Sequence, residues 1–125
     1  MNALALLLAI EPVACHERVY DAVVLDVIDG DTFWAMVEVG MGIHYRVKIR
    51  AAHADAPETR GKNKDPIRGP KAEEFTRAWL AEYGNVVYIV NDKPGKYNRR
   101  RIAEVYRPGS SESWSEALHR TGNVR

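Results

Sequence analysis

The sequence has 125 residues, of which 46% are hydrophobic and 28% are charged. These values are typical of one soluble, folded domain, and they argue against a disordered or membrane-embedded chain. The net charge is only +1, so charge as a whole does not indicate a nucleic-acid partner, and evidence for one must come from local clusters.

Residues 1–18 form an apolar N-terminal extension ahead of a domain predicted for residues 19–125. The apolar run at 3–10, followed by Cys15, is compatible with a short leader and a lipoprotein-like cysteine. No basic residue precedes this run, and Glu and Pro interrupt it, which favours a helix that packs on the domain or on a partner. The run is too short to span a bilayer. Localisation therefore stays open between the cytoplasm and secretion or the periplasm.

The first part of the domain is predicted to be a three-stranded meander. Residues 20–28 are rich in β-branched side chains and end at Asp-Gly-Asp, a turn signal, and residues 32–39 follow as a second strand. After Gly-Met-Gly, apolar and polar residues alternate over 43–50, as in a half-buried strand.

A long loop is predicted for residues 51–69, which have no sustained period and contain two prolines. Loops of this length in compact domains are usually functional. A helix follows, because Pro70 stands in its first turn, Gly84 lies just past its end, and an apolar series recurs at helical spacing. That series consists of Ala72, Phe75, Trp79 and Tyr83.

The last part of the domain is predicted to contain two more strands and a short helix. Residues 86–90 and 100–106 are the strands, separated by a loop at 91–98. Ser113 and Glu116 have the spacing of a capping box, and they predict a short helix that closes at Gly122. We therefore expect an α+β, mainly β protein. Its fold would be a five-stranded OB-fold β-barrel with one helix between strands 3 and 4 and a short C-terminal helix.

Two acidic clusters stand at the ends of neighbouring predicted strands. The first is Asp29-Gly30-Asp31-Thr32 and the second is Asp55-Ala56-Pro57-Glu58, with Arg50 five residues before Asp55. Each cluster alone is compatible with an ordinary turn. Together, and with Tyr97 and an arginine cluster further on, they indicate a polar site where the strand ends converge.

With these motifs in this order, the sequence resembles the staphylococcal nuclease family over roughly residues 23–124. The agreement continues through a Gly-Pro helix start, a Lys-Tyr-x-Arg segment and a final helix with Glu-Ala-Leu. The resemblance implies a calcium-dependent phosphodiesterase, an endonuclease that hydrolyses DNA and RNA. The implied products carry 3′-phosphate ends, because the bond between the 5′-oxygen and phosphorus is cleaved.

The resemblance also implies a metal site. Its ligands would be the carboxylates of Asp31 and Asp55 and the carbonyl of Ala56, with Glu58 near a bound water that it orients or deprotonates. Such a set of oxygen ligands, completed by water and substrate phosphate, suits Ca²⁺ rather than zinc. The chain has one cysteine, and no Cys/His set has zinc spacing.

Two arginines of the family contact the scissile phosphate, and they match Arg50 and Arg100. The second match depends on register, because this chain carries one residue more than the family pattern between Tyr97 and Ala103. Counting back from Ala103 selects Arg100, whereas counting forward from Tyr97 selects Arg99. We prefer Arg100, because a strand fixes register better than a loop.

Lys96 and Tyr97 match family residues that contact a substrate phosphate, and the basic residues between 60 and 71 would add attraction that does not depend on base sequence. Trp34 and Tyr45 are interpreted as packing residues rather than platforms for bases. His44, His53 and His119 are scattered and receive no role. The chain also stops before the C-terminal tyrosines that stack on a base in the family.

Two other functions remain open. One is a catalytically inactive module that uses the same fold to bind nucleic acid or protein, and such modules typically lose the metal carboxylates and arginines. The other is an OB-fold protein that only binds single strands, which requires exposed aromatic residues on the strand face. Retention of Asp31, Arg50, Asp55 and Glu58 favours the enzyme.

Overall fold

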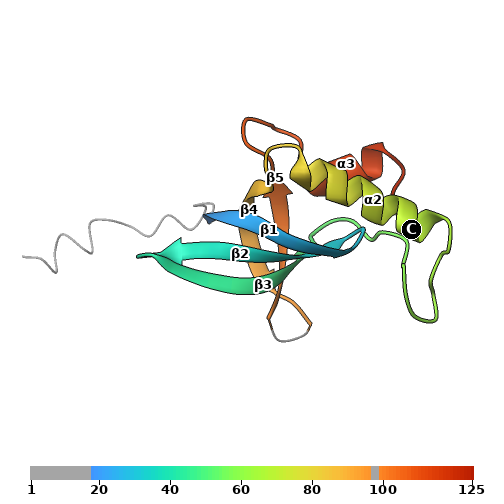
Figure 1. The fold of residues 1–125 in the computed structure, drawn as a ribbon, viewed down its shortest axis with the longest axis horizontal. Coiled ribbons are helices and arrows are strands. Elements are labelled where there is room, and N and C mark those ends of the chain that lie inside the picture. The colour runs from blue at the N-terminus through green and yellow to red at the C-terminus, as the bar shows by residue number, and fades with distance from the viewer. Residues whose placement is uncertain (1–17, 97–98) are drawn as a thin grey trace, which may run out of the picture.

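Five strands close into a β-barrel, and two short helices pack beside it (Figure 1). The computed structural model describes residues 18–96 and 99–125, so all but the last residue of the predicted extension 1–18 lies outside the described residues. The architecture is consistent with an OB-like barrel. In chain order the elements are β1 (Val19–Asp29), β2 (Thr32–Gly40), β3 (Ile43–Ala51), α2 (Arg68–Ala81), β4 (Val86–Pro94), β5 (Arg100–Tyr106) and α3 (Trp114–Arg120).

The predicted meander is confirmed, because β1 pairs with β2 and β2 pairs with β3, both antiparallel. Side chains alternate between the barrel interior and its outer face, as the pleat of a strand requires. The interior residues of β2 and β3 are apolar and buried; they are Phe33, Ala35, Val37, Val47, Ile49 and Ala51. Polar and basic residues of the same strands therefore lie on the outer face.

The barrel closes through two further pairings. β3 pairs with β5 in parallel, and β4 pairs antiparallel with both β5 and β1, which gives the strand order β1-β2-β3-β5-β4. Parallel neighbours need a long crossover connection. Here the connection from β3 to β5 runs through the loop, α2 and β4.

The predicted loop at 91–98 is wrong for its first half, because β4 continues to Pro94. A register shift between Val90 and Lys93 interrupts the pairing with β5, and Asn91 has a positive φ of 51° at this point. Beyond the bulge, Lys93 and Pro94 pair again with β5. A bulge interrupts the period of two, so the sequence pattern ended before the strand did.

The predicted helix is confirmed as α2, which buries Ala72, Trp79 and Leu80. Tyr83 does not belong to this buried face, because it follows the end of α2 and is 48% exposed. No helix among the described residues is long and apolar enough to cross a membrane.

The predicted capping box is present at the start of α3. Glu116 N–H donates to the Ser113 hydroxyl, and Ser113 N–H donates to the Glu116 carboxylate. The first residue of this helix, Trp114, is fully buried and meets Phe33 edge to face, with ring centroids 5.1 Å apart. α3 thus packs against the core that the barrel strands share.

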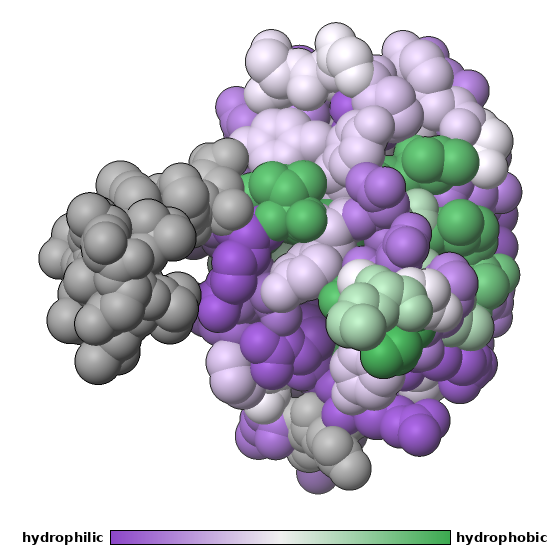
Figure 2. Space-filling view, turned by 90° about the vertical axis from the view of Figure 1, so that its left-hand side faces the viewer, coloured by the Kyte–Doolittle hydropathy of each residue, from purple (hydrophilic) through white to green (hydrophobic). Residues whose placement is uncertain are grey.

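Figure 2 views the molecule from the side of the β2–β3 hairpin. Exposed apolar residues near this hairpin include Val39, Met41 and Ile43. In this view the apolar residues form small, separate patches between polar residues and no continuous apolar surface. Scattered apolar residues of this kind are normal on a protein surface.

Candidate active site

The turn between β1 and β2 holds the carboxylate of Asp31 in a fixed position. Asp31 is buried, and its Oδ1 accepts a hydrogen bond from the Thr32 hydroxyl at 2.9 Å. Its Oδ2 accepts one from Ala56 N–H at 3.0 Å, across 25 residues of sequence. The Asp31 carbonyl also accepts from Ala51 N–H at 3.0 Å. The two predicted acidic clusters are therefore joined directly.

A buried chain of hydrogen bonds links this turn to the two helices. The Trp114 indole N–H donates to the Thr76 hydroxyl at 3.2 Å, and that hydroxyl donates to the Gly30 carbonyl at 2.7 Å. Gly30 has no room for a side chain, because a Cβ atom there would lie 2.6 Å from Ala56 Cβ and 2.8 Å from Ala72 Cβ. Both helices thus help to position the turn, and sequence reasoning had assigned no such role to Thr76 and Trp114.

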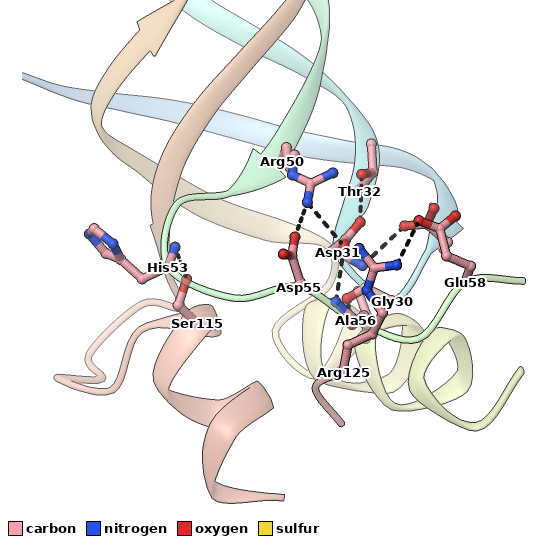
Figure 3. Close-up of polar contacts among 12 residues, drawn as sticks. Gly30, Asp31, Thr32, Arg50, His53, Asp55, Ala56, Glu58, Ser115 and Arg125 are labelled. Atoms are coloured by element: carbon pink, nitrogen blue, oxygen red, sulfur yellow. Dashed lines mark hydrogen bonds and ion pairs between the residues drawn. The ribbon is translucent and has the colours of Figure 1, made fainter. Parts of the chain in front are cut away.

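Arg50 links the two carboxylates that the sequence marks as metal ligands. Its Nη2 donates to Asp55 Oδ1 and lies 3.7 Å from Asp31 Oδ2 (Figure 3). Arg50 comes from the end of β3, where it is paired with Thr32 of β2. The Asp31 side chain is 9% exposed and that of Asp55 is 55% exposed. The site therefore has one fixed carboxylate and one that is accessible to solvent.

Glu58 lies beside this pair, and its main chain is well anchored. Its carbonyl accepts from Asp65 N–H at 2.8 Å, and Gly69 packs so closely that a Cβ there would lie 2.3 Å from this carbonyl oxygen. The Glu58 carboxylate lies 3.9 Å from Arg125 Nη1 (Figure 3). Arg125 N–H in turn donates to the Asp55 carbonyl at 2.7 Å. Sequence reasoning missed Arg125, since no local pattern joins it to this loop.

Asp29 is a further carboxyl of the site that the sequence interpretation left without a role. Its Oδ1 accepts from Asp31 N–H at 3.1 Å. Burial raises the pKa of Asp29 from its ordinary 3.8 to about 7, and the neighbouring Asp31 carboxyl and the charge of Glu58 add to this effect. The only sequence signal for Asp29 was its position in the Asp-Gly-Asp turn, two residues before Asp31.

Strand register separates the three arginines of the arginine cluster, residues 99–101. Ala103 and Val105 of β5 are buried, so alternation sends Arg101 inward and Arg100 outward. Arg101 Nε donates to Asp92 at 2.7 Å, within a pocket at the mouth of the barrel. Arg99 precedes β5 with a positive φ of 59°.

Arg100 shares the outer face with Arg50. In the parallel pair of β3 and β5, Arg100 lies opposite Lys48 and Ile102 lies opposite Arg50. The two arginines are thus one step apart along the same face. This geometry favours Arg100 over Arg99 as the partner of Arg50.

The remaining predicted residues lie at the rim or outside the described part. Lys96 is exposed and lines a hollow of about 300 Å³ together with Arg99 and Arg100. Tyr97 lies outside the described residues. Ala56 is buried, and its N–H is the group that binds Asp31.

A groove of about 500 Å³ opens next to Arg50 and Asp55. Polar and apolar residues line it, and they include His53, Lys93, Ile102, His119 and Arg125. The His119 ring Nε2 lies 2.7 Å from the His53 carbonyl, so the two histidines that the sequence left without a role meet at its wall. The third, His44, lies on β3 opposite Glu38, toward the hairpin. A ligand that occupies this groove would lie beside the Arg50 side chain.

The donor set fits a hard cation held partly by ligands from outside the protein. Among the described residues no group of three or more His, Cys, Asp or Glu side chains converges as a complete metal cage. Asp31 and Asp55 nevertheless both face one positively charged nitrogen of Arg50. Two carboxylates directed at one point suit a cation that keeps waters and binds substrate oxygens.

A scan against protein-family models finds no match for this sequence. A search of the curated proteins finds no significant match either.

The raised pKa of Asp29 predicts a pH dependence of stability in the metal-free protein. A carboxyl with a raised folded-state pKa stabilises the fold below its unfolded pKa, and this contribution is lost as pH rises through the folded value. Asp29→Asn keeps a neutral group at this position. It should therefore raise the Tm at pH 8 by roughly 4 °C or more, which is about 1 kcal/mol after solvent screening is allowed for.

Thermal melts in excess chelator between pH 4 and 8 would measure this effect. At pH 4 the variant and the wild type should melt alike, because the carboxyl is then protonated. Asp21→Asn, at an exposed position of the same strand, is the matched control and should show no such trend. A stability difference that stays constant over the whole pH range would contradict the prediction.

Proposed function

We propose that this protein is a calcium-dependent nuclease of the staphylococcal nuclease type, built on an OB-like barrel, that hydrolyses phosphodiester bonds in DNA and RNA. The observation that carries the proposal is the convergence of Asp31, Asp55 and Arg50 at one end of the barrel. Glu58 lies beside them, and Arg100 shares the outer face with Arg50. Together these groups are the components that hydrolysis of a phosphodiester requires.

Arg50 and Arg100 would bind the phosphoryl group that is attacked. Arg50 carries five N–H donors in a planar fork, and its side chain is 28% exposed, next to the groove. A guanidinium can donate two parallel hydrogen bonds to two phosphoryl oxygens. Because negative charge grows on these oxygens during in-line attack, donors that are already in place lower the barrier.

Asp31, Asp55 and the Ala56 carbonyl would hold the calcium ion. When bound, this ion supplies positive charge at the phosphoryl oxygens and orients the substrate. The hydrogen bonds from Ala56 N–H and the Thr32 hydroxyl fix the Asp31 carboxylate in advance. Asp55 is the more exposed of the two carboxylates, so it would hold the cation on the side that is open to solvent and substrate.

Glu58 would orient the attacking water and accept its proton. Its side chain is 41% exposed, so water can reach it, and its anchored main chain limits its movement. Attack of the water oxygen on phosphorus breaks the bond to the 5′-oxygen, which takes a proton from solvent. The products are a 3′-phosphate end and a free 5′-hydroxyl.

One assay tests this function directly. DNA and RNA should be degraded in the presence of calcium, and degradation should stop in excess chelator. Zinc should support far less cleavage, because the ligands are hard oxygens. The products should carry a 3′-phosphate. A polymerase should therefore not extend them until a phosphatase has removed this phosphate.

Two outcomes of the assay would overturn the proposal. Equal cleavage with calcium and with chelator would show that the activity does not depend on the metal site. Binding of DNA or RNA without any cleavage would favour the inactive OB-fold module instead.

A further inference from the structure

Trp34 lies on the outer face of β2 beneath two cationic side chains. It is half-buried and is paired with Lys48 of β3. The guanidinium carbon of Arg46 lies 4.0 Å from the centroid of the Trp34 ring, and Lys48 Nζ lies 5.2 Å from it. This arrangement places an indole and two positive charges on one patch of exposed sheet.

The same patch continues into the candidate active site. Val47, Ile49 and Ala51 of β3 are buried, so the residues between them face outward. These outward residues form a basic row of Arg46, Lys48 and Arg50, with neighbours about 7 Å apart along the strand. The row ends at Arg50, which contacts Asp31 and Asp55.

The cations next to Trp34 differ from other arginines of the surface. Arg101, Arg107 and Arg120 each form an ion pair with a carboxylate. Among residues 18–96 and 99–125, no carboxylate forms an ion pair with Arg46 or Lys48. Their positive charge is therefore available to an anionic ligand from outside the chain.

The strands on the two sides of this patch differ in charge. On one side, Arg100 of β5 lies opposite Lys48 and adds a further cation. On the other side, Asp26 of β1 lies opposite Trp34, and its carboxylate is directed to Arg77 of α2 at 3.9 Å. A polyanion that follows β3 is thus attracted toward Arg100 of β5 rather than toward Asp26 of β1.

We propose that Trp34, Arg46 and Lys48 form a second nucleotide subsite, which binds a single strand of DNA or RNA as it leaves the catalytic centre along β3. A base would stack on the layer of Trp34 and Arg46, so that Trp34 would act as a platform and not only as the packing residue that the sequence suggested. The adjoining phosphates would contact Lys48 and Arg46. Stacking of this kind needs a base that is unpaired and free of its neighbours, so the subsite selects single strands over duplexes. The subsite rests on the proposed nuclease function in one respect, because that function places the scissile phosphate at Arg50, where the basic row ends.

Binding in excess chelator tests the subsite without cleavage. Anisotropy of a fluorescent single-stranded oligonucleotide of about ten nucleotides would give the Kd of each variant. Trp34→Leu should weaken binding about tenfold, the range expected for loss of one stacked base. It should weaken binding of a duplex of the same sequence much less. Arg46→Gln should also reduce the slope of log Kd against log salt by about one, as expected when one contact with a phosphate is lost.

Tyr83→Leu is the matched control, because Arg107 lies 5.5 Å from the Tyr83 ring in a similar surface pair beyond the end of α2. This variant should bind like the wild type, and melting curves of all variants would exclude unfolding. Equal single-strand affinity of Trp34→Leu and wild type would overturn the subsite, even if the protein is a nuclease. Weaker binding by Trp34→Leu in a protein that cleaves nothing would support the subsite and contradict the nuclease.

Discussion

Arg50→Ala and Arg100→Ala should each lower the turnover of DNA by about a hundredfold or more at saturating calcium, the scale on which one preorganised transition-state donor acts. Arg50 reaches the carboxylate pair from β3, and Arg100 lies on the same face of the neighbouring strand β5. Arg50→Lys should recover little activity, because an ammonium cannot form two parallel hydrogen bonds to phosphoryl oxygens.

The other two arginines of the cluster provide the controls. Arg99→Asn removes the charge but keeps a residue that tolerates the left-handed backbone, and it should affect mainly the salt dependence of binding. Arg101→Ala leaves Asp92, which is 16% exposed, without its partner, so it should lower the Tm rather than turnover.

Turnover of all five variants would be compared at saturating DNA, with melting curves alongside. A severe Arg99→Asn variant together with a normal Arg100→Ala variant would show that the extra residue before β5 shifts the register. Normal turnover in every variant would assign any cleavage to another site.

Asp31→Asn and Asp55→Asn should each reduce cleavage to the level seen in chelator. Each substitution removes one of the two charged carboxylates that face the cation position, while the side chain keeps its size. A neutral amide oxygen is a weaker ligand for a hard divalent ion than a carboxylate. Calcium titration by calorimetry should accordingly show weaker binding for both variants, alongside the activity assay.

Alanine at the same two positions separates metal binding from support of the fold. Asp31→Ala also leaves Ala56 N–H and the Thr32 hydroxyl without their acceptor, at a cost of about 1–3 kcal/mol for a buried group. Asp55→Ala should change the Tm little, because its side chain is 55% exposed. Full activity of either Asn variant at low calcium would contradict the metal assignment.

Local sequence patterns predicted most of the barrel. β-Branched residues and a turn signal located β1 and β2, alternation located β3, and the spacing of Ser113 and Glu116 located α3. These features depend on residues that are close together in the chain, such as a period of two or a cap three residues from its partner. The second half of β4 was missed, because the bulge at Asn91 has no signature in that period.

The sequence by itself determined which chemical groups are present: the Asp-Gly-Asp turn, the Asp55-to-Glu58 loop, Arg50 and the arginine cluster. Only the tertiary structure decided which of them meet, because closure of the barrel joins Asp31 to Ala56 and sets Arg100 beside β3. It also added Asp29, half-buried next to Asp31, and Arg125, whose backbone N–H donates to the Asp55 carbonyl. Contacts of this kind depend on strand register and on burial between distant segments, and neither leaves a periodic trace in the sequence.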